Sequence, residues 1–285
     1  MIMQSNLKEK LYYCLFGLCA FVSIVAVLVI CAFLFANAIP TTSKIGLSHY
    51  LFESYWNPDE EIFGIFSFIV GSLYVSALAI LLGGSIGILS AIYLSQFCPK
   101  HIKRYLLPAI ELLGAIPSVV YGFFGLVIIV PFLANTFEGI SGKSLLAASL
   151  ILSIMILPTI ILVSKSALDS IPRIYYEGAL ALGASKERSV FFVCLRAAKS
   201  GILASIILGI GRAIGEAMAV IMVAGNQAQI PTSLLDGVRT LTTSIVLEMG
   251  YSQGLHRDVL ITNGVVLFVF ILLINLALNA LKNRG

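Results

Sequence analysis

The chain has 285 residues, of which 59% are hydrophobic and only 11% charged, and its mean hydropathy is +1.01. This composition lies far from that of a soluble domain, so lipid must solvate much of the protein surface. The net charge of +4 is small, and the placement of the basic residues around the membrane accounts for it without nucleic-acid binding.

Six stretches are long and apolar enough to cross the hydrocarbon core, which requires about 20 mostly apolar residues. They run from Leu11 to Ala36, Ser67 to Leu94, Leu106 to Ala134, Ser144 to Ser164, Gly201 to Ala224 and Val259 to Leu281. We therefore expect an all-α integral membrane protein with about six transmembrane helices, forming a single domain over residues 1–285.

The first stretch has some features of a secretory signal peptide. Lys8 and Lys10 precede it, and Ala36-Asn37-Ala38 imitates a cleavage site of small residues. Its apolar run is nevertheless longer than the about 7–15 residues of a signal peptide. The length favours an uncleaved first helix over a cleaved signal.

The loops differ in their content of lysine and arginine, which accumulate on the cytoplasmic side of a membrane. If the N-terminus lies inside, the outer loops receive four basic residues: Lys44, Lys143, Arg239 and Arg257. The inner segments receive Lys8, Lys10, Lys100, Lys103, Arg104, Lys165, Arg173, Lys186, Arg188, Arg196, Lys199, Lys282 and Arg284. We expect both termini to be cytoplasmic.

The sequence shows no pattern typical of an enzyme or a metal site. The five cysteines offer no external pair for a disulfide, and we interpret His49, His101 and His256 as solvated loop residues without metal-ligand spacing. No nucleophile with a base and no Walker-type phosphate loop is present. We therefore expect no catalytic residues, no metal and no cofactor bound by this chain, so energy must come from a partner or an ion gradient.

The fifth apolar stretch carries two charges, Arg212 and Glu216, near the middle of the bilayer. Such residues cost about 2.5–3.5 kcal/mol even on insertion-based scales, and they usually face a bundle interior or a wet cavity. Because the two residues are four apart in a helical segment, we expect them to share one face and to pair. Either they neutralise each other and join two helices, or Arg212 offers a cation to an anion in transit, with Glu216 as its resting counter-ion.

Two Gly-x-x-x-Gly steps lie in the second and fifth stretches. Gly83 with Gly87, and Gly211 with Gly215, would permit the close approach of a second helix. Since the second step flanks the two charges, it would bring a helix or a substrate close to them.

Pro117 lies inside the third stretch, where it frees a carbonyl and bends or breaks a helix. Polar backbone at that depth must line a cavity or find protein partners. Pro117, Ser118 and Tyr121 could therefore line a transport pathway, and a packing kink is an equal alternative. We interpret Glu111 as an interfacial residue that pairs with Lys103 or Arg104.

The inner loop of residues 165–200 is the only inner loop long enough to form helices of its own. Pro172 lies where a helix would start, and Gly183 predicts a turn between two short helices. The segment could lie on lipid headgroups or dock on a cytosolic partner.

Glu177-Gly178-Ala179 followed by Gly183 resembles the Glu-Ala-Ala-x-x-x-Gly signature of ABC importer permeases, which docks on the ATPase subunit. Gly178 replaces the first alanine of that signature, and Arg196 stands where the longer pattern usually has a proline. The spacing from the glutamate to the glycine is kept.

The fifth stretch, Gly211-Arg-Ala-Ile-Gly-Glu-Ala-Met-Ala-Val followed by Ala224-Gly-Asn, resembles that of the C-type permease subunit of bacterial phosphate transporters. Trp56-Asn57-Pro58, Ile116-Pro-Ser-Val-Val-Tyr-Gly and Gly254-Leu-His-Arg extend the resemblance over most of the chain. The sequence motif around Arg212 favours the C-type over the sister A-type subunit.

The resemblance implies the type I ABC importer permease fold and a place in the bacterial inner membrane. It also implies a heterodimer with an A-type sister permease, two copies of a cytosolic ATPase that uses ATP and Mg²⁺, and an external phosphate-binding protein. Arg212 and Glu216 would then matter for phosphate passage by alternating access. A permease for sulfate or molybdate, or a secondary transporter that uses Glu216 as its coupling carboxylate, are the alternatives.

Overall fold

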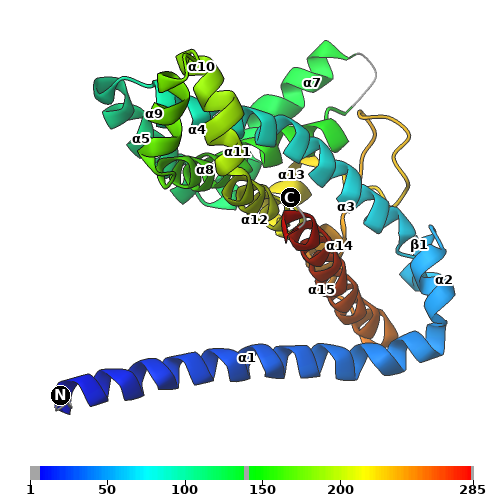
Figure 1. The fold of residues 1–285 in the computed structure, drawn as a ribbon. Helices are drawn as coiled ribbons and strands as arrows, with labels where there is room; N and C mark the ends of the chain where they lie inside the picture. The colour runs from blue at the N-terminus through cyan, green and yellow to red at the C-terminus, as the bar shows by residue number, and fades with distance from the viewer. Residues whose placement is uncertain (1–6, 138–140, 284–285) are drawn as a thin grey trace.

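The computed structural model describes residues 7–137 and 141–283, and most of these residues are helical (Figure 1). The described part contains one small antiparallel hairpin, in which β1 (Trp56–Asn57) pairs with β2 (Ile62–Phe63) around a 3-10 turn, Pro58–Glu60. The expectation of an all-α protein is therefore confirmed. Arg284, which we assigned to the inner side, lies outside the described residues.

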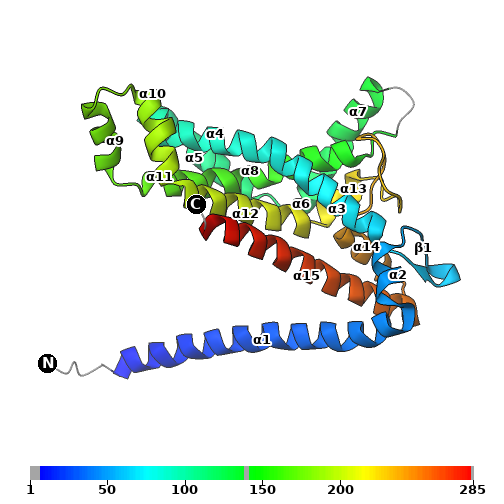
Figure 2. The same ribbon diagram turned by 45° about the vertical axis from the view of Figure 1, so that its right-hand side comes forward.

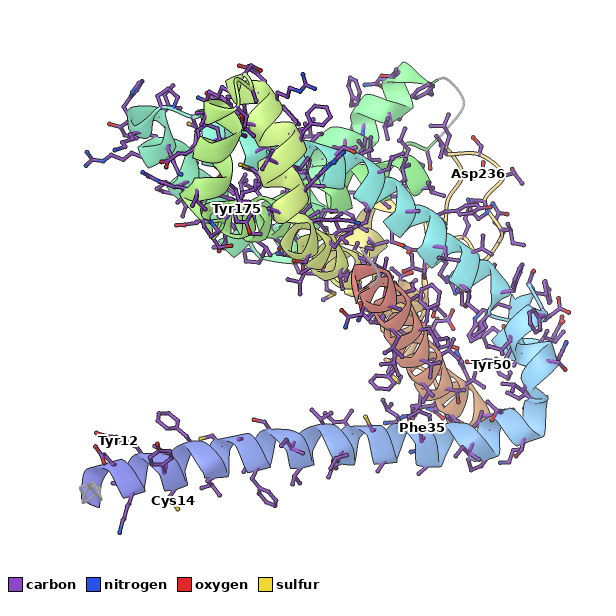
Figure 3. All side chains as sticks on the ribbon, viewed as in Figure 1. Tyr12, Cys14, Phe35, Tyr50, Tyr175 and Asp236 are labelled. Carbon is purple, nitrogen blue, oxygen red and sulfur yellow. The ribbon has the colours of Figure 1, made fainter. Side chains whose placement is uncertain are left out.

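The first helix, α1 (Leu7–Ile45), lies apart from the other helices over much of its length (Figures 1 and 2). Its C-terminal part packs against α15 (Gly254–Asn283), where Phe35 meets Phe268 edge-on at a centroid distance of 6.4 Å. Tyr12 and Cys14 lie on the part that is remote from the bundle (Figure 3). An apolar surface this long requires lipid or another chain to cover it.

The second predicted span is one long rod that begins after α2 (Leu47–Phe52) and the hairpin. Along the chain it consists of α3 (Phe66–Ala79), the π-turn η2 (Ile80–Gly84), α4 (Ser85–Ile92) and the π-turn η3 (Tyr93–Phe97). The rod packs against α8 (Leu145–Asp169), the most buried of the candidate spans. Ile151, Leu152, Ile156 and Ile160 of α8 form the centre of the main hydrophobic core.

The third predicted span is interrupted at Ile116 and Pro117, with one helix before the break and one continuous helical segment of three parts after it. Its parts are α5 (Lys100–Ala115), α6 (Ser118–Phe124), the π-turn η4 (Gly125–Ile129) and α7 (Val130–Thr136). Ile116 and Pro117 have ψ angles of 129° and 143°, so the chain is extended between α5 and α6. The proline breaks the helix rather than bending it.

The inner loop forms helices, as the sequence predicts, and α8 extends into it as far as Asp169. Its parts are α9 (Arg173–Ala181), α10 (Lys186–Ser189), the π-turn η5 (Val190–Cys194) and α11 (Leu195–Ala197). Pro172 precedes α9, and Gly183 lies between α9 and α10 with a φ of +83°. A bend of 69° separates the segment Lys186–Ala197 from the helix that follows.

The fifth predicted span is also broken, into α12 (Lys199–Gly215) and α13 (Met218–Val223). A long loop then leads to α14 (Leu241–Glu248) and to α15, the last span. Five helices of the described residues are long and apolar enough to cross a membrane, and the bent pair ending at Gly215 makes a sixth. The number of spans and the break at Pro117 in the third span are therefore as expected, whereas the break in the fifth span is not.

Candidate functional site

At the break in the third span, the carbonyl group of Leu113 receives no hydrogen bond from Pro117, because proline has no N–H. The carbonyl oxygen of Leu113 accepts a 2.7 Å hydrogen bond from the hydroxyl of Tyr121, which is a buried side chain of α6. Ser118, the first residue of α6, is half-buried beside the break. The three predicted pathway residues, Pro117, Ser118 and Tyr121, thus all lie at one discontinuity in the helix.

The two broken spans pack against each other next to their breaks. A Cβ added to Gly122 of α6 would lie 2.8 Å from Sδ of Met222 and 2.9 Å from Cα of Ala219, both on α13. Only glycine permits this approach, since real Cβ atoms do not come so close to a neighbouring backbone. The breaks therefore lie in one region of the molecule.

Glu216 lies at the break in the fifth span rather than on a helix face. Helix α12 ends at Gly215, and Glu216 has an extended ψ of 124°. Its Oε1 accepts a 3.1 Å hydrogen bond from the N–H of Ala219, so the carboxylate caps α13. The hydroxyl of Thr242 donates to the backbone carbonyl of Glu216 at 3.0 Å and anchors the break to α14.

The expected pair between Arg212 and Glu216 is wrong. An i, i+4 pair requires continuous helix, and the helix ends one residue before the glutamate. Arg212 instead donates from Nη1 to the hydroxyl of Thr159 on α8 at 3.1 Å. Among the described residues, no carboxylate oxygen lies within 4.0 Å of its guanidinium group.

Arg212 lies on the wall of an open pocket of about 410 Å³ between α5, α8 and α12. The pocket is lined by Glu111, Gly114, Ala115, Pro158, Thr159, Leu162 and Arg212. Its polar groups are thus a guanidinium, a hydroxyl and a carboxylate, which suits a small hydrogen-bonding anion better than an apolar ligand. Sequence reasoning missed Thr159, because a threonine in an apolar helix gives no signal of its own.

Glu111 does not pair with Lys103 or Arg104 as expected. It lines the pocket of Arg212, and Lys103 lies 4.0 Å from the carboxylate of Asp169 instead. Asp169 also accepts from Lys165 at 2.7 Å and from the hydroxyl of Ser95 at 2.6 Å. Lys103 therefore lies near the carboxylate of Asp169 at the end of α8, while Glu111 lies on the face of α5 that lines the pocket.

The two Gly-x-x-x-Gly steps differ in what they contact. A Cβ at Gly83 would lie 2.5 Å from the carbonyl oxygen of Ser153, and one at Gly87 would lie 2.9 Å from Cγ2 of Ile160, both on α8. Cβ atoms at Gly211 and Gly215 would meet open space within the described chain. The first step thus packs helices inside this chain, and the second is left for a second chain or a substrate.

Residues 83–284, which carry both breaks and the pocket, match the family model of the binding-protein-dependent transport system inner membrane component. The chain belongs to this family. The permease is accordingly a multi-pass protein of the bacterial inner membrane and a component of a transporter.

Several curated relatives cover most of the chain. The probable ABC transporter permease protein YqgH of Bacillus subtilis is 39% identical over 93% of this chain and 88% of its own length. The phosphate transport system permease proteins PstC of Mesorhizobium japonicum and Haemophilus influenzae are 36% and 33% identical, over 85% and 90% of this chain and 80% and 86% of their own lengths. The resemblance to PstC-type permeases is confirmed.

Solved structures of ABC importers have the same fold. A bacterial ABC transporter involved in the import of alginate has a TM-score of 0.61 at 17% identity, covering 97% of this chain and 99% of that chain. The methionine transporter MetNI in inward-facing conformations has a TM-score of 0.60 at 21% identity, covering 81% and 99%. These likenesses show the ABC importer permease fold.

The segment of α9 and the turn that follows it exposes several apolar side chains. Glu177, Gly178 and Ala179 lie on α9, which also carries Tyr175 (Figure 3). Leu182, just after this helix, is 91% exposed, and the left-handed Gly183 turns the chain toward α10. A Cβ at Gly178 would meet open space, so the alanine of the signature would also fit here, and the glycine removes one methyl group from the exposed surface.

A buried ionic cluster on the other side of the permease was missed by the sequence reasoning. Glu248, at the end of α14, accepts from Nη1 of Arg239 at 2.6 Å and from the indole of Trp56 at 3.0 Å. Nε2 of His256 lies 2.8 Å from Oε2 of Glu248, the oxygen that accepts from Trp56, whereas Arg239 donates to Oε1. The interpretation of His256 as a solvated residue is therefore wrong, because its ring is hydrogen-bonded to Glu248 in a part-buried position.

Proposed function

We propose that this chain is the transmembrane permease subunit of an ATP-driven importer of inorganic phosphate. The observation that carries the proposal is Arg212, a half-buried guanidinium that faces an open pocket and is bonded to a neutral hydroxyl. A desolvated oxyanion requires a fixed cation, and guanidinium binds phosphate through two parallel hydrogen bonds. The PstC relatives, which are named phosphate transport system permeases, support this choice of anion.

The pathway lies at the two breaks. Arg212 contacts the anion, the hydroxyl of Thr159 orients the guanidinium, and Pro117, Ser118 and Tyr121 form the wall around the break in the third span. Broken helices suit this role because free backbone groups at membrane depth line a polar passage. Glu216 supports the pathway by capping α13 rather than by carrying charge to the anion.

The energy comes from partners of the permease. A dimer of cytosolic ATPase subunits hydrolyses ATP with Mg²⁺, and Glu177, Gly178, Ala179 and Gly183 form the element that docks on it. An A-type sister permease completes the channel, and an external binding protein delivers phosphate. Closure of the ATPases moves α9 and opens the pathway outward, so that access alternates between the two sides.

The test is ATP-dependent uptake of radiolabelled phosphate by the complete complex reconstituted in vesicles. We expect Arg212→Gln to lower the uptake rate by at least about tenfold, because a hydrogen bond to a charged group contributes about 1.5–3 kcal/mol. Undiminished uptake would remove Arg212 from the pathway. Competition by sulfate or molybdate at equal concentration would assign the permease to another oxyanion instead.

The docking role is tested separately with a cysteine at position 179. In the assembled complex it should form a crosslink with the ATPase subunit, whereas a cysteine at the exposed Tyr12 of α1 should not. Absence of any contact at position 179 would refute the docking assignment.

A further inference from the structure

Glu216, the counter-ion that the sequence predicts for Arg212, does not pair with it. Glu216, four residues later, uses its carboxylate to cap α13 and follows the end of α12. The hydroxyl of Thr159 that accepts from Arg212 is neutral. A half-buried cation within a membrane segment is costly without an opposite charge nearby.

The one carboxylate among the residues that line the pocket of Arg212 is Glu111. Glu111 comes from α5 and Arg212 from α12, while Pro158 and Thr159 of α8 lie between them. The two charged groups do not meet within 4.0 Å in this structure, and the pocket of about 410 Å³ holds far more than one water molecule, about 30 Å³. The open pocket that both residues line is therefore large enough for an oxyanion.

The helix that carries Glu111 is jointed. Ile116 and Pro117 are extended, so no continuous helix links α5 to α6, and the hydroxyl of Tyr121 joins the two across the break. Within the described chain α5 packs chiefly on α8, where a Cβ at Gly114 would lie 3.3 Å from Pro158. Helix α5 can therefore tilt about this contact without losing helical hydrogen bonds.

We propose that Glu111 is the exchangeable counter-ion of Arg212, pairing with it when the pathway holds no anion and giving way when phosphate arrives. This inference rests on the proposed function. When phosphate occupies the pocket, the nearby carboxylate weakens its attraction to Arg212 and speeds its release. Glu111 thus sets how long the anion stays, and it contributes to transport rather than to assembly.

The experiment is a double-mutant cycle of Glu111→Gln and Arg212→Gln, measured as phosphate uptake by the reconstituted complex. Glu111→Gln alone should lower both KM and Vmax by about threefold or more, because phosphate binds more tightly and leaves more slowly. Arg212→Gln alone leaves an unpaired carboxylate that repels the anion. The uptake rate of the double variant should therefore be about three- to tenfold higher than that of Arg212→Gln.

Two further variants make the result specific. Glu111→Asp keeps the charge and should stay close to the wild type, and Glu9→Gln, at an exposed acidic residue of α1, should change nothing. Size-exclusion chromatography checks that each complex assembles. If Glu111→Gln does not assemble, Glu111→Met supplies the neutral variant of similar length.

The outcomes separate this inference from the proposed function. Unchanged KM and Vmax in Glu111→Gln, or a double variant no better than Arg212→Gln, would overturn the counter-ion role while leaving Arg212 in the pathway. Failure of the wild-type complex to import phosphate would instead overturn the proposed function itself.

Discussion

The hydroxyl of Tyr121 lies 2.7 Å from the carbonyl oxygen of Leu113, four residues before Pro117. In a continuous helix that carbonyl would accept from the N–H of residue 117, which proline does not have. The N–H of Ile116 donates to the same oxygen over a long distance of 3.4 Å, so this hydrogen bond is weak. The tyrosine thus replaces the hydrogen bond that the proline removes and links the two halves of the third span through one side-chain contact.

We expect Tyr121→Phe to destabilise the permease by about 1 kcal/mol, the usual net value of one hydrogen bond, and more if the carbonyl stays unsatisfied. The midpoint of thermal inactivation of the solubilised complex should fall by about 2–4 °C. Tyr105→Phe is the matched control, since Tyr105 is 75% exposed. An unchanged midpoint in Tyr121→Phe would mean that another donor satisfies Leu113.

If Glu216 acts by capping α13, its substitution by alanine and by glutamine should have different effects, whereas a role through its charge would make the two effects equal. Glu216→Ala removes the acceptor for the N–H of Ala219 and should cost about 0.5–2 kcal/mol, with a matching loss of uptake. Glu216→Gln keeps an oxygen that can accept and should retain most of the uptake. Phosphate uptake and thermal inactivation of both variants are the measurements.

Equal losses in the two Glu216 variants, as severe as the loss in Arg212→Gln, would show that the carboxylate acts through its charge. The secondary-transporter alternative would then regain its basis, because it requires Glu216 as a coupling carboxylate. Dependence of uptake on the ATPase subunit tests that alternative directly.

Hydropathy predicts the positions of the spans because lipid imposes a minimum apolar length on every crossing helix. The break at Pro117 is also predictable, since the chemistry of proline is local. The break at Glu216 is not, because the residues from Gly211 to Ala219 contain no helix breaker other than glycine. It depends on tertiary contacts, among them the bond from Thr242 to the carbonyl of Glu216.

The pocket and the buried cluster likewise depend on residues far apart in the sequence. Glu111 and Arg212 line one pocket only because α5 and α12 both pack on α8. Trp56, Arg239 and His256 meet Glu248 from three separate segments, so no local pattern distinguishes His256 from a solvated histidine. The chemistry of each residue is readable from the sequence, but its neighbours are not.

The cluster around Glu248 makes a strong prediction about stability. Its carboxylate is only 7% exposed, so Glu248→Gln would leave Arg239 facing a neutral group in a largely buried position. Breaking a buried ion pair from one side typically costs about 3–5 kcal/mol. We expect this variant to unfold well below the wild-type temperature, as measured by thermal inactivation.

Trp56→Phe provides a graded comparison within the same cluster. It removes only the indole donor to Glu248 and keeps an aromatic ring against Phe63 and Phe68, so its cost should be about 1–3 kcal/mol. A Glu248→Gln variant as stable as Trp56→Phe would mean that the substitution does not leave Arg239 as an uncompensated buried charge.

The loop before α14 should respond to pH through Asp236. Its carboxylate accepts from the N–H of Ser233 at 2.8 Å and from the hydroxyl and N–H of Thr232 at 2.9 and 2.8 Å. The bond from the Ser233 backbone is the main cause that holds the pKa of Asp236 below its usual range, followed by those from Thr232. The same loop caps α8, because the carbonyls of Asp236 and Leu234 accept from Leu145 and Leu146.

A pKa lowered in the folded state means that the carboxylate stabilises the loop fully above its ordinary value of about 3.9. That contribution is lost as the pH falls through the lower folded value. Hydrogen exchange of residues 231–238, corrected for the intrinsic effect of pH, should therefore stay slow from pH 7 to about 4 and accelerate below. Asp236→Asn should exchange faster at pH 7 and lack the acid transition, whereas Asp59→Asn, at an exposed aspartate outside the loop, should match the wild type. An acid transition that persists in Asp236→Asn would assign it to another group.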